Sequence, residues 1–196
     1  MGSLEVIVGT MFSGKSTELI LRANKYAISG ISTQVFRPSR DIRTEQMVSH
    51  DGLKIPAAYA ANAQEIVASI KPETKVIAID EAQFFDSSII EHCVAWADAD
   101  KTVIVAGLLR DFRDQPFPFA DRKATMYDLL RYADDITHKS AICTFAVNGS
   151  ICSRPASKAQ RILADGKIAP ANTPTVQLGG KESYAARCRM HYVKIE

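Results

Sequence analysis

GTMFSGKST, residues 9–17, is the stretch that decides the fold of this chain. It contains the pattern G-x-x-x-x-G-K-S/T in full, between the apolar run of residues 4–8 and a helical period that begins at Lys15. In such a strand–loop–helix, backbone N–H groups converge on phosphates and the helix N-terminus adds partial positive charge. We therefore predict a nucleotide-phosphate site made of Gly9, Thr10, Met11, Phe12, Ser13, Gly14, Lys15 and Ser16.

Further apolar runs at residues 33–37, 76–79 and 102–106 alternate with segments of helical period. Residues 62–65, Asn-Ala-Gln-Glu, have the pattern of a capping box, and Ser87 is placed to cap the next helix, to about residue 97. Strands that are apolar throughout are typical of a parallel sheet covered on both faces. We expect an α/β fold, a P-loop parallel sheet with helices on both faces.

The composition changes after residue 136. Residues 143–152 and 161–181 are rich in small, polar and turn-forming residues, which does not suit another strand–helix unit. We expect residues 1–140 to form the P-loop core and residues 141–196 a small second lobe with a long loop. Residues 38–60 are mixed in composition and are expected to be irregular.

Composition narrows the class of protein. Apolar residues make up 46% and charged residues 23% of the 196 residues, which is typical of a globular domain. The formal charge of +2 gives no sign of a nucleic-acid surface, and no apolar run approaches the ~20 residues of a membrane span. The first residues, MGSLEVIVG, do not resemble a signal peptide, so the expected location is the cytoplasm, with no membrane or nucleic-acid partner.

Two adjacent acids, Asp80 and Glu81, follow the apolar run at residues 76–79. In P-loop proteins an acid at a strand end helps to hold Mg²⁺, together with the P-loop hydroxyl, here Ser16. The side chains of neighbouring residues at a strand end point in different directions. We therefore expect Asp80 to bind Mg²⁺ and Glu81 to face the phosphate acceptor. The alternative is that the pair only caps the edge of the sheet.

Five segments in order resemble the type II (cytosolic-type) thymidine kinases: GTMFSGKST, RPSRDIRTEQMVSHDG, DEAQFF, the GL…DF…PF segment at 107–117, and SYAARCRMHY. The resemblance implies a RecA-like ATP-binding core, a zinc lobe with a substrate-covering loop, and a homotetramer. It implies transfer of the ATP γ-phosphate to the 5′-hydroxyl of thymidine to give dTMP, in nucleotide salvage for DNA synthesis. Inhibition by dTTP is expected as feedback.

The resemblance also implies residue roles. Glu81 matches the catalytic base that takes the 5′-hydroxyl proton, which suits a carboxylate beside a phosphate site. The remaining cofactor-binding positions are Asp41, Ile42, Arg43, Asp80, Glu81, Ala82 and Gln83. The expected substrate-binding positions are Met11, Phe84, Leu108, Phe112, Phe117, Thr175, Val176, Gln177, Leu178, Gly179 and Tyr184. Each Phe taken alone is as well explained as part of the core. Arg37 and Arg40 are expected to be solvated or structural, and Leu109 departs from the Asp that many members have.

The cysteines raise the question of a metal. The family carries zinc on a Cys-x2-Cys pair and a second Cys-x2-Cys/His pair, and only the second is intact here, as Cys188-Arg-Met-His191. An insertion of about six residues would turn the first pair into Cys143-x8-Cys152. We predict a closed, structural Cys₃His zinc site on Cys143, Cys152, Cys188 and His191, the alternative being a lost site with free cysteines. Cys93 lies on an apolar helix stripe and is expected to be buried.

Two other classes of function compete with a nucleoside kinase. A P-loop switch or motor on nucleic acid would need a basic face, which the balanced charge does not indicate. A zinc-bearing binding module with a structural nucleotide would not need the adjacent acids Asp80 and Glu81. A different deoxynucleoside acceptor also remains open.

Overall fold

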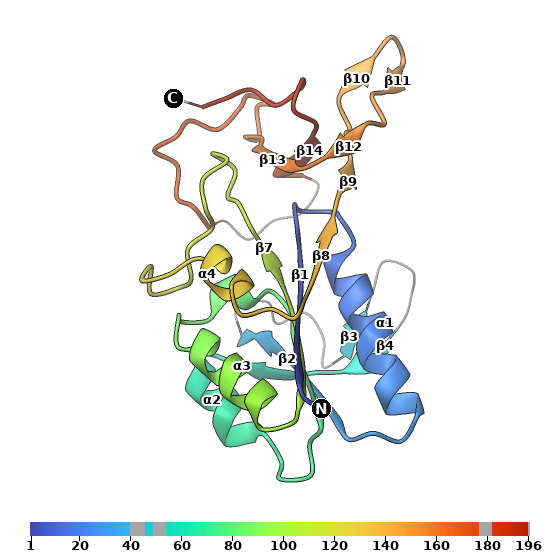
Figure 1. Cartoon of the computed structure of the whole chain (residues 1–196). Helices are drawn as coiled ribbons and strands as arrows, with labels where there is room; N and C mark the ends of the chain where they lie inside the picture. Colours follow the sequence, from blue (N-terminus) through green and yellow to red (C-terminus); the bar gives the residue numbers. More distant parts are fainter. Residues whose placement is uncertain (40–45, 49–53, 177–181, 196) are drawn as a thin grey trace.

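The computed structural model describes residues 1–39, 46–48, 54–176 and 182–195. Its centre is a six-stranded sheet in the order β5-β2-β6-β7-β1-β8, and each neighbouring pair is parallel (Figure 1). The strands are β1 (Ser3–Gly9), β2 (Thr33–Pro38), β5 (Ala58–Ala60), β6 (Val76–Ile79), β7 (Thr102–Leu108) and β8 (Asp135–Lys139). The predicted α/β fold with a parallel sheet is confirmed.

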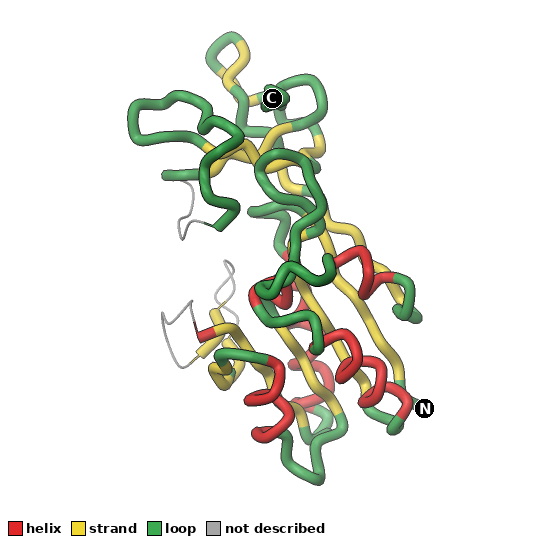
Figure 2. Tube along the Cα trace, turned by 90° about the vertical axis from the view of Figure 1, so that its left-hand side faces the viewer, coloured by secondary structure: helices red, strands yellow, loops and turns green. Residues whose placement is uncertain are grey.

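Helices cover both faces of the sheet, as expected: Figure 1 shows helices on either side of it, and Figure 2 looks onto one of the helix-covered faces. The side chains of β1 alternate: Val6 and Val8 pack with the cluster that includes α3, whereas Ile7 packs with the cluster that includes α1. The helices are α1 (Lys15–Ile28), α2 (Ala63–Ser69), α3 (Ile89–Asp98) and α4 (Met126–Leu130), with a 3₁₀ turn η2 (Ala82–Phe84). Burial on both faces explains why the central strands are mostly apolar.

The helix ends agree with the sequence in two places and differ in a third. Gly30 lies just beyond α1 with φ +75°, and Asn62 Oδ1 accepts a hydrogen bond from Glu65 N at the start of α2. The predicted cap on α3 was wrong. Ser87 donates its hydroxyl to Asp121, and Asp86 accepts from the backbone N–H of Ser88 instead. The helix begins one residue later than expected, with Ser88 at its N-cap and no side-chain cap bond, because the Ser87 hydroxyl is bound to Asp121.

Two parts of the sheet were not predicted. Residues 38–60 were expected to be irregular, yet they supply the edge strand β5 and a small antiparallel pair, β3 (Gln46–Val48) and β4 (Lys54–Pro56). The other edge strand, β8, begins where the core pattern appeared to end, and most of its residues are exposed. Short edge strands do not need apolar residues on both faces, so their sequences carry a weak signal.

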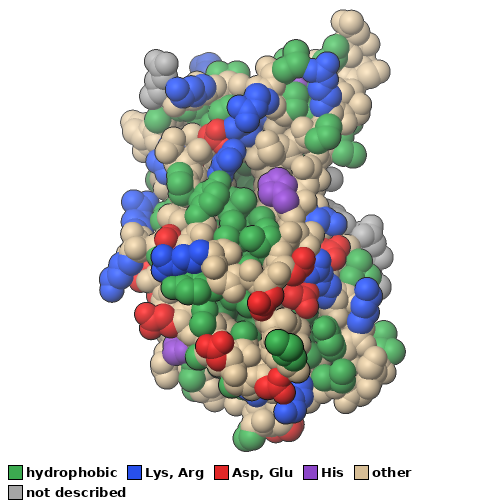
Figure 3. All heavy atoms as spheres, in the orientation of Figure 1, with side chains coloured by type: hydrophobic (Ala, Val, Ile, Leu, Met, Phe, Trp, Pro, Cys, Tyr) green, Lys and Arg blue, Asp and Glu red, His purple; other side chains and the backbone are tan. Residues whose placement is uncertain are grey.

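Short antiparallel strands follow the sheet beyond residue 140, above the carboxyl ends of the parallel strands (Figure 1). β9 (Ala141–Ile142) pairs with β12 (Pro155–Ala156), β10 (Ala146–Val147) with β11 (Ser150–Ile151), and β13 (Lys158–Arg161) with β14 (Tyr184–Arg187). On the face seen in Figure 3, Asp and Glu gather over the sheet and helices, while most of the charged side chains in this upper region are Lys and Arg.

Candidate active site

The loop between β1 and α1 has the backbone of a phosphate cradle. Phe12 and Gly14 both have positive φ, +64° and +80°, which turns successive N–H groups toward one side. Gly9 is required because a Cβ there would lie 2.3 Å from the Lys139 carbonyl oxygen of β8. Ser13 Oγ is buried and has no hydrogen-bond partner among the described residues. The loop therefore offers a concave set of donors at the start of α1.

Lys15 and Ser16 lie at the base of this cradle. Lys15 is 5% exposed and donates to the Thr10 carbonyl at 2.9 Å. Burial lowers the pKa of Lys15, against the opposing effects of Glu81 and Asp80. The Ser16 hydroxyl donates to both carboxylate oxygens of Asp80, at 2.9 and 3.1 Å. The predicted pairing of the P-loop hydroxyl with the strand-end acid is thus present.

The two acids after β6 point to different partners. Asp80 is 1% exposed and faces Ser16, while the Glu81 carboxylate accepts a hydrogen bond from Gln83 Nε2 at 2.5 Å. Glu81 has φ +49°, a left-handed conformation that costs a non-glycine residue about 1 kcal/mol or more. Burial and the Glu81 charge raise the pKa of Asp80 to about 7, although Arg37, Ser16 and Lys15 oppose this shift.

Arg37 was expected to be solvated or structural, and the structure shows that it is not solvated. Its side chain on β2 is only 12% exposed, with Nε 3.9 Å from Asp80 Oδ2. The contact exists because β2 and β6 are adjacent and parallel, with Phe36 opposite Ile79. This adjacency would have been a usable signal only once the strand order was known.

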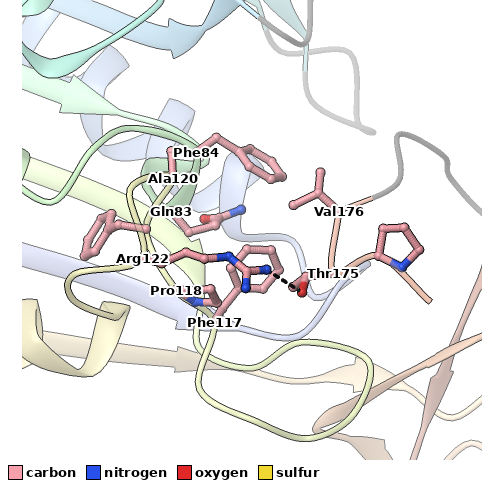
Figure 4. A pocket seen from close by; sticks show the side chains of 10 residues that line it. Gln83, Phe84, Phe117, Pro118, Ala120, Arg122, Thr175 and Val176 are labelled. Carbon is pink, nitrogen blue, oxygen red and sulfur yellow. Dashed lines mark hydrogen bonds between the residues drawn. The ribbon is translucent and has the colours of Figure 1, made fainter. Parts of the chain in front are cut away.

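An aromatic pocket of about 290 Å³ lies beside Gln83 (Figure 4). Phe84 and Phe117 meet edge to face on one wall, with ring centroids 5.9 Å apart, and Thr175 and Val176 lie across from Phe84. The other lining residues are Gln83, Pro118, Phe119, Ala120, Arg122 and Pro174. Of the expected substrate positions, the structure therefore brings Phe84, Phe117, Thr175 and Val176 together at one pocket.

Four other expected substrate positions lie outside this lining. Phe112 and Tyr184 are buried in a cluster of their own, against which Met11 packs. Leu108 ends β7 and is 8% exposed. Ala82, expected at the cofactor site, is fully buried in the main core. The expected positions Asp41, Ile42, Arg43, Gln177, Leu178 and Gly179 fall outside the described residues.

Three arginines that the sequence did not indicate bind the segment leading to the pocket. Arg113 and Arg122 donate to Thr175 Oγ1, at 2.5 and 3.2 Å. Arg161 donates to the Pro174 carbonyl at 2.6 Å and also lies over the rings of Phe112 and Tyr184. These contacts join residues that are 13 to 62 positions apart, so no local sequence pattern predicts them.

The predicted cysteine cluster is present. One ligand atom from each of Cys143, Cys152, Cys188 and His191 lies within 4.8 Å of all the others. His191 Nδ1 is 3.6 Å from the Cys143 sulfur and 3.5 Å from the Cys188 sulfur. In a tetrahedral site with bonds of 2.0–2.3 Å, neighbouring ligand atoms lie about 3.3–3.8 Å apart, so this set fits zinc.

The unusual spacing of the first cysteine pair has a simple structural cause. Residues 146–151 form the β10–β11 hairpin, whose turn residues Asn148 and Gly149 both have positive φ, +46° and +80°. Asn-Gly at such positions favours a tight hairpin turn. The Cys152 N–H then bonds the Phe145 carbonyl at 2.8 Å, which returns Cys152 to Cys143. Cys93, by contrast, is buried in the core, as expected.

Comparison with known proteins agrees with this arrangement. A family model described as thymidine kinase matches residues 2–192. A thymidine kinase of Thermococcus kodakarensis is 40% identical, over 98% of this chain and 94% of that protein. A thymidine kinase of Pyrobaculum aerophilum is 39% identical, over 97% of this chain and 98% of that protein. No helix within the described part of the chain is long and apolar enough to cross a membrane. The chain belongs to the thymidine kinase family.

Proposed function

We propose that this chain is a thymidine kinase that transfers the γ-phosphate of ATP to the 5′-hydroxyl of thymidine, a salvage step in DNA synthesis. One observation carries the proposal: the phosphate cradle and the aromatic pocket meet at a single pair of acids. Asp80 faces Ser16 of the cradle, and Glu81 is bound by Gln83, which lines the pocket. Family membership supports thymidine as acceptor and ATP as donor.

The donor side of the reaction rests on the P-loop. Residues 9–16 would bind the ATP phosphates through backbone N–H groups, with Lys15 neutralising charge on the β and γ oxygens. Ser16 and Asp80 would hold Mg²⁺, since a hydroxyl and a carboxylate are hard oxygen ligands. When bound, the metal supplies charge neutralisation at the transferring phosphate. Ala82, Gln83, Asp41, Ile42 and Arg43 remain proposed members of the donor site.

On the acceptor side, Glu81 takes the proton from the 5′-hydroxyl as that oxygen forms its bond to the γ-phosphorus. The bond from the γ-phosphorus to the β–γ bridging oxygen breaks, ADP leaves, and dTMP carries the phosphoryl group. General-base help of this kind contributes about 10²- to 10⁴-fold in rate. The protonated Glu81 then returns its proton to solvent.

Thymidine would occupy the aromatic pocket. Phe84 and Phe117 present apolar surface to the planar base, and Thr175 and Val176 lie across from Phe84. We propose that the backbone of residues 175–179 hydrogen-bonds the base. Met11, Leu108, Phe112 and Tyr184 complete the site in this proposal, since Phe112 and Tyr184 share one cluster beside the P-loop residue Met11.

We further propose that Cys143, Cys152, Cys188 and His191 bind one structural zinc ion. The zinc would fix the two ends of the segment that leads to residues 175–179, because Cys152 precedes it and Cys188 follows it. A homotetramer, inhibition by dTTP and a cytoplasmic location are also proposed on the family resemblance. Light scattering and inhibition kinetics test the tetramer and the dTTP inhibition.

A nucleoside panel tests the function. Purified protein with Mg-ATP should phosphorylate thymidine, and the product should be dTMP with phosphate on the 5′ oxygen. Deoxycytidine, deoxyadenosine and deoxyguanosine should react much more slowly, and ATP alone should be hydrolysed more slowly still. Steady ATP hydrolysis without any phosphorylated nucleoside would overturn the proposal and favour a P-loop switch or motor.

A further inference from the structure

Gln83 is a buried glutamine that joins the end of a central strand to the Glu81 carboxylate. It lies in the η2 turn and is 1% exposed. Its Oε1 accepts the Leu108 backbone N–H at 3.0 Å, and its Nε2 donates to Glu81 Oε2 at 2.5 Å. The amide has one acceptor end and one donor end, so the Leu108 N–H fixes which end faces Glu81.

The packing around this amide leaves it little freedom. A Cβ on Gly107 would lie 2.8 Å from Gln83 Oε1 and 2.7 Å from Met126 Cε. The space beside the amide is therefore filled on the β7 side, and a Cβ at position 107 would require the Gln83 amide or the end of the Met126 side chain to shift. Because β7 is a central strand with buried neighbours on both sides, it provides a rigid reference for the amide.

The consequence for Glu81 follows from its two oxygens. Oε2 accepts the hydrogen bond from Gln83 Nε2, while Oε1 accepts no hydrogen bond from the described residues. A carboxylate held through one oxygen keeps the other free to accept a proton from a substrate hydroxyl. Glu81 also has a left-handed backbone with φ +49°, so its side chain leaves the chain in a direction that ordinary strand-end residues do not take.

We propose that Gln83 is a positioning residue, which orients Glu81 Oε1 toward the acceptor hydroxyl by holding Oε2 against the β7 strand. This inference rests on the proposed role of Glu81 as the base. It goes beyond the donor-site membership proposed above for Gln83, because the amide acts through Glu81; a contact of Gln83 with ATP would instead raise the KM for ATP. It also differs from nucleoside binding, because the loss should fall on kcat and not on KM.

The test is a double-mutant cycle on Glu81 and Gln83, measured as kcat and KM for thymidine and for ATP. Gln83→Met keeps the length of the side chain and removes both hydrogen bonds. We expect it to lower kcat about 10- to 100-fold with both KM values changed less than about threefold, as for a misplaced catalytic group. In a Glu81→Gln background, the same change should lower kcat less than twofold, because the group that Gln83 positions is already lost.

A matched control comes from the second buried glutamine, Gln160. It is also 1% exposed and its Oε1 accepts a backbone N–H, from Val193 at 2.8 Å, but its Nε2 has no hydrogen-bond partner among the described residues. Gln160→Met should therefore leave kcat unchanged. Gly107→Ala is a second variant that displaces the amide without altering it, and it should lower kcat in the same way.

The outcomes separate this inference from the proposed function. If Glu81→Gln leaves kcat unchanged, the base assignment fails and the inference fails with it. If Glu81→Gln lowers kcat but Gln83→Met does not, or raises KM instead, only the inference is overturned. Multiplicative losses in the double variant would also overturn it. Should Gln83→Met fail to fold, Gly107→Ala decides: unchanged kcat contradicts the proposal, and lowered kcat at constant KM supports it.

Discussion

Lys15 is a buried cation that donates a hydrogen bond to a carbonyl oxygen. The charges of two carboxylates, Glu81 and Asp80, also act on it without direct contact. Burial lowers its pKa, which means that the folded protein without ATP disfavours the charged form. Such a residue is retained for the phosphates that it meets and contributes little to folding.

Lys15→Met should therefore separate activity from stability. We expect kcat to fall about 10²- to 10³-fold, as for loss of one charge-stabilising donor. The melting temperature without ATP should not fall, because a buried charge is replaced by an apolar side chain of similar length. Lys25→Met, on the exposed side of the same helix, is the control and should change neither quantity. A melting temperature several degrees below that of the wild type would show that Lys15 is structural.

Local sequence identified the phosphate cradle because its chemistry lies within eight consecutive residues, Gly9 to Ser16. The contact of Arg37 with Asp80 could not be predicted, because it depends on the pairing of β2 with β6. The contact between Gln83 and Leu108 could not be predicted either, because it joins positions 25 residues apart. When two contacting residues lie far apart in the sequence, their contact can be predicted only once the strand order is known.

At the scale of elements, Asp86 ties two helices together. Its Oδ2 accepts from Ala63 N at the start of α2, at 3.0 Å, and its Oδ1 accepts from Ser88 N before α3, at 3.2 Å. Burial would raise the pKa of Asp86, but these bonds and the Ser88 hydroxyl outweigh it and hold the pKa below 3.8.

Asp86→Ala should destabilise the protein by about 1–2 kcal/mol at pH 7, the usual cost of lost helix caps. The pKa of Asp86 is lowered on folding, so its contribution is full above the unfolded value of 3.8 and is lost as pH falls through the folded value. The difference in free energy of unfolding between wild type and variant, measured by urea unfolding, should accordingly shrink below about pH 4. Glu73→Ala, in the exposed turn before β6, is the control and should change the free energy of unfolding very little at either pH. A difference in free energy of unfolding that grew in acid would contradict the capping role.

The central strands were predictable and the edge strands were not. β6 is apolar throughout and β1 and β7 are mostly apolar, because helices cover both of their faces. β8 has the sequence Asp-Ile-Thr-His-Lys and is largely exposed, and β5 has three residues. Edge strands are held by backbone hydrogen bonds to a neighbour, which any sequence can form.

At the scale of the whole molecule, the β10–β11 hairpin between the first two cysteines leaves the Cys₃His cluster intact. All six residues of the β10–β11 hairpin, 146–151, are exposed. Removing them would join Cys143-Thr-Phe directly to Cys152, which is a Cys-x2-Cys spacing.

Deletion of residues 146–151 should therefore leave one zinc ion per chain and shift the melting temperature by no more than about 2 °C, as for a change of ~0.5 kcal/mol. Atomic absorption and thermal unfolding measure these quantities. Cys188→Ser is the matched variant: we expect it to lose the zinc and to raise the KM for thymidine, because the segment between Cys152 and Cys188 loses one anchor. Loss of zinc from the deletion variant would mean that the hairpin is part of the site.

The central claim is that Glu81 is the base for phosphate transfer to thymidine. The most direct measurement is kcat for dTMP formation by Glu81→Gln, with thymidine affinity measured in parallel by calorimetry. An amide of the same shape keeps the Gln83 side of the site filled but cannot take a proton. The account predicts a loss in kcat of about 10²- to 10⁴-fold with thymidine affinity nearly unchanged. A variant that still forms dTMP within a few-fold of the wild-type rate would contradict it.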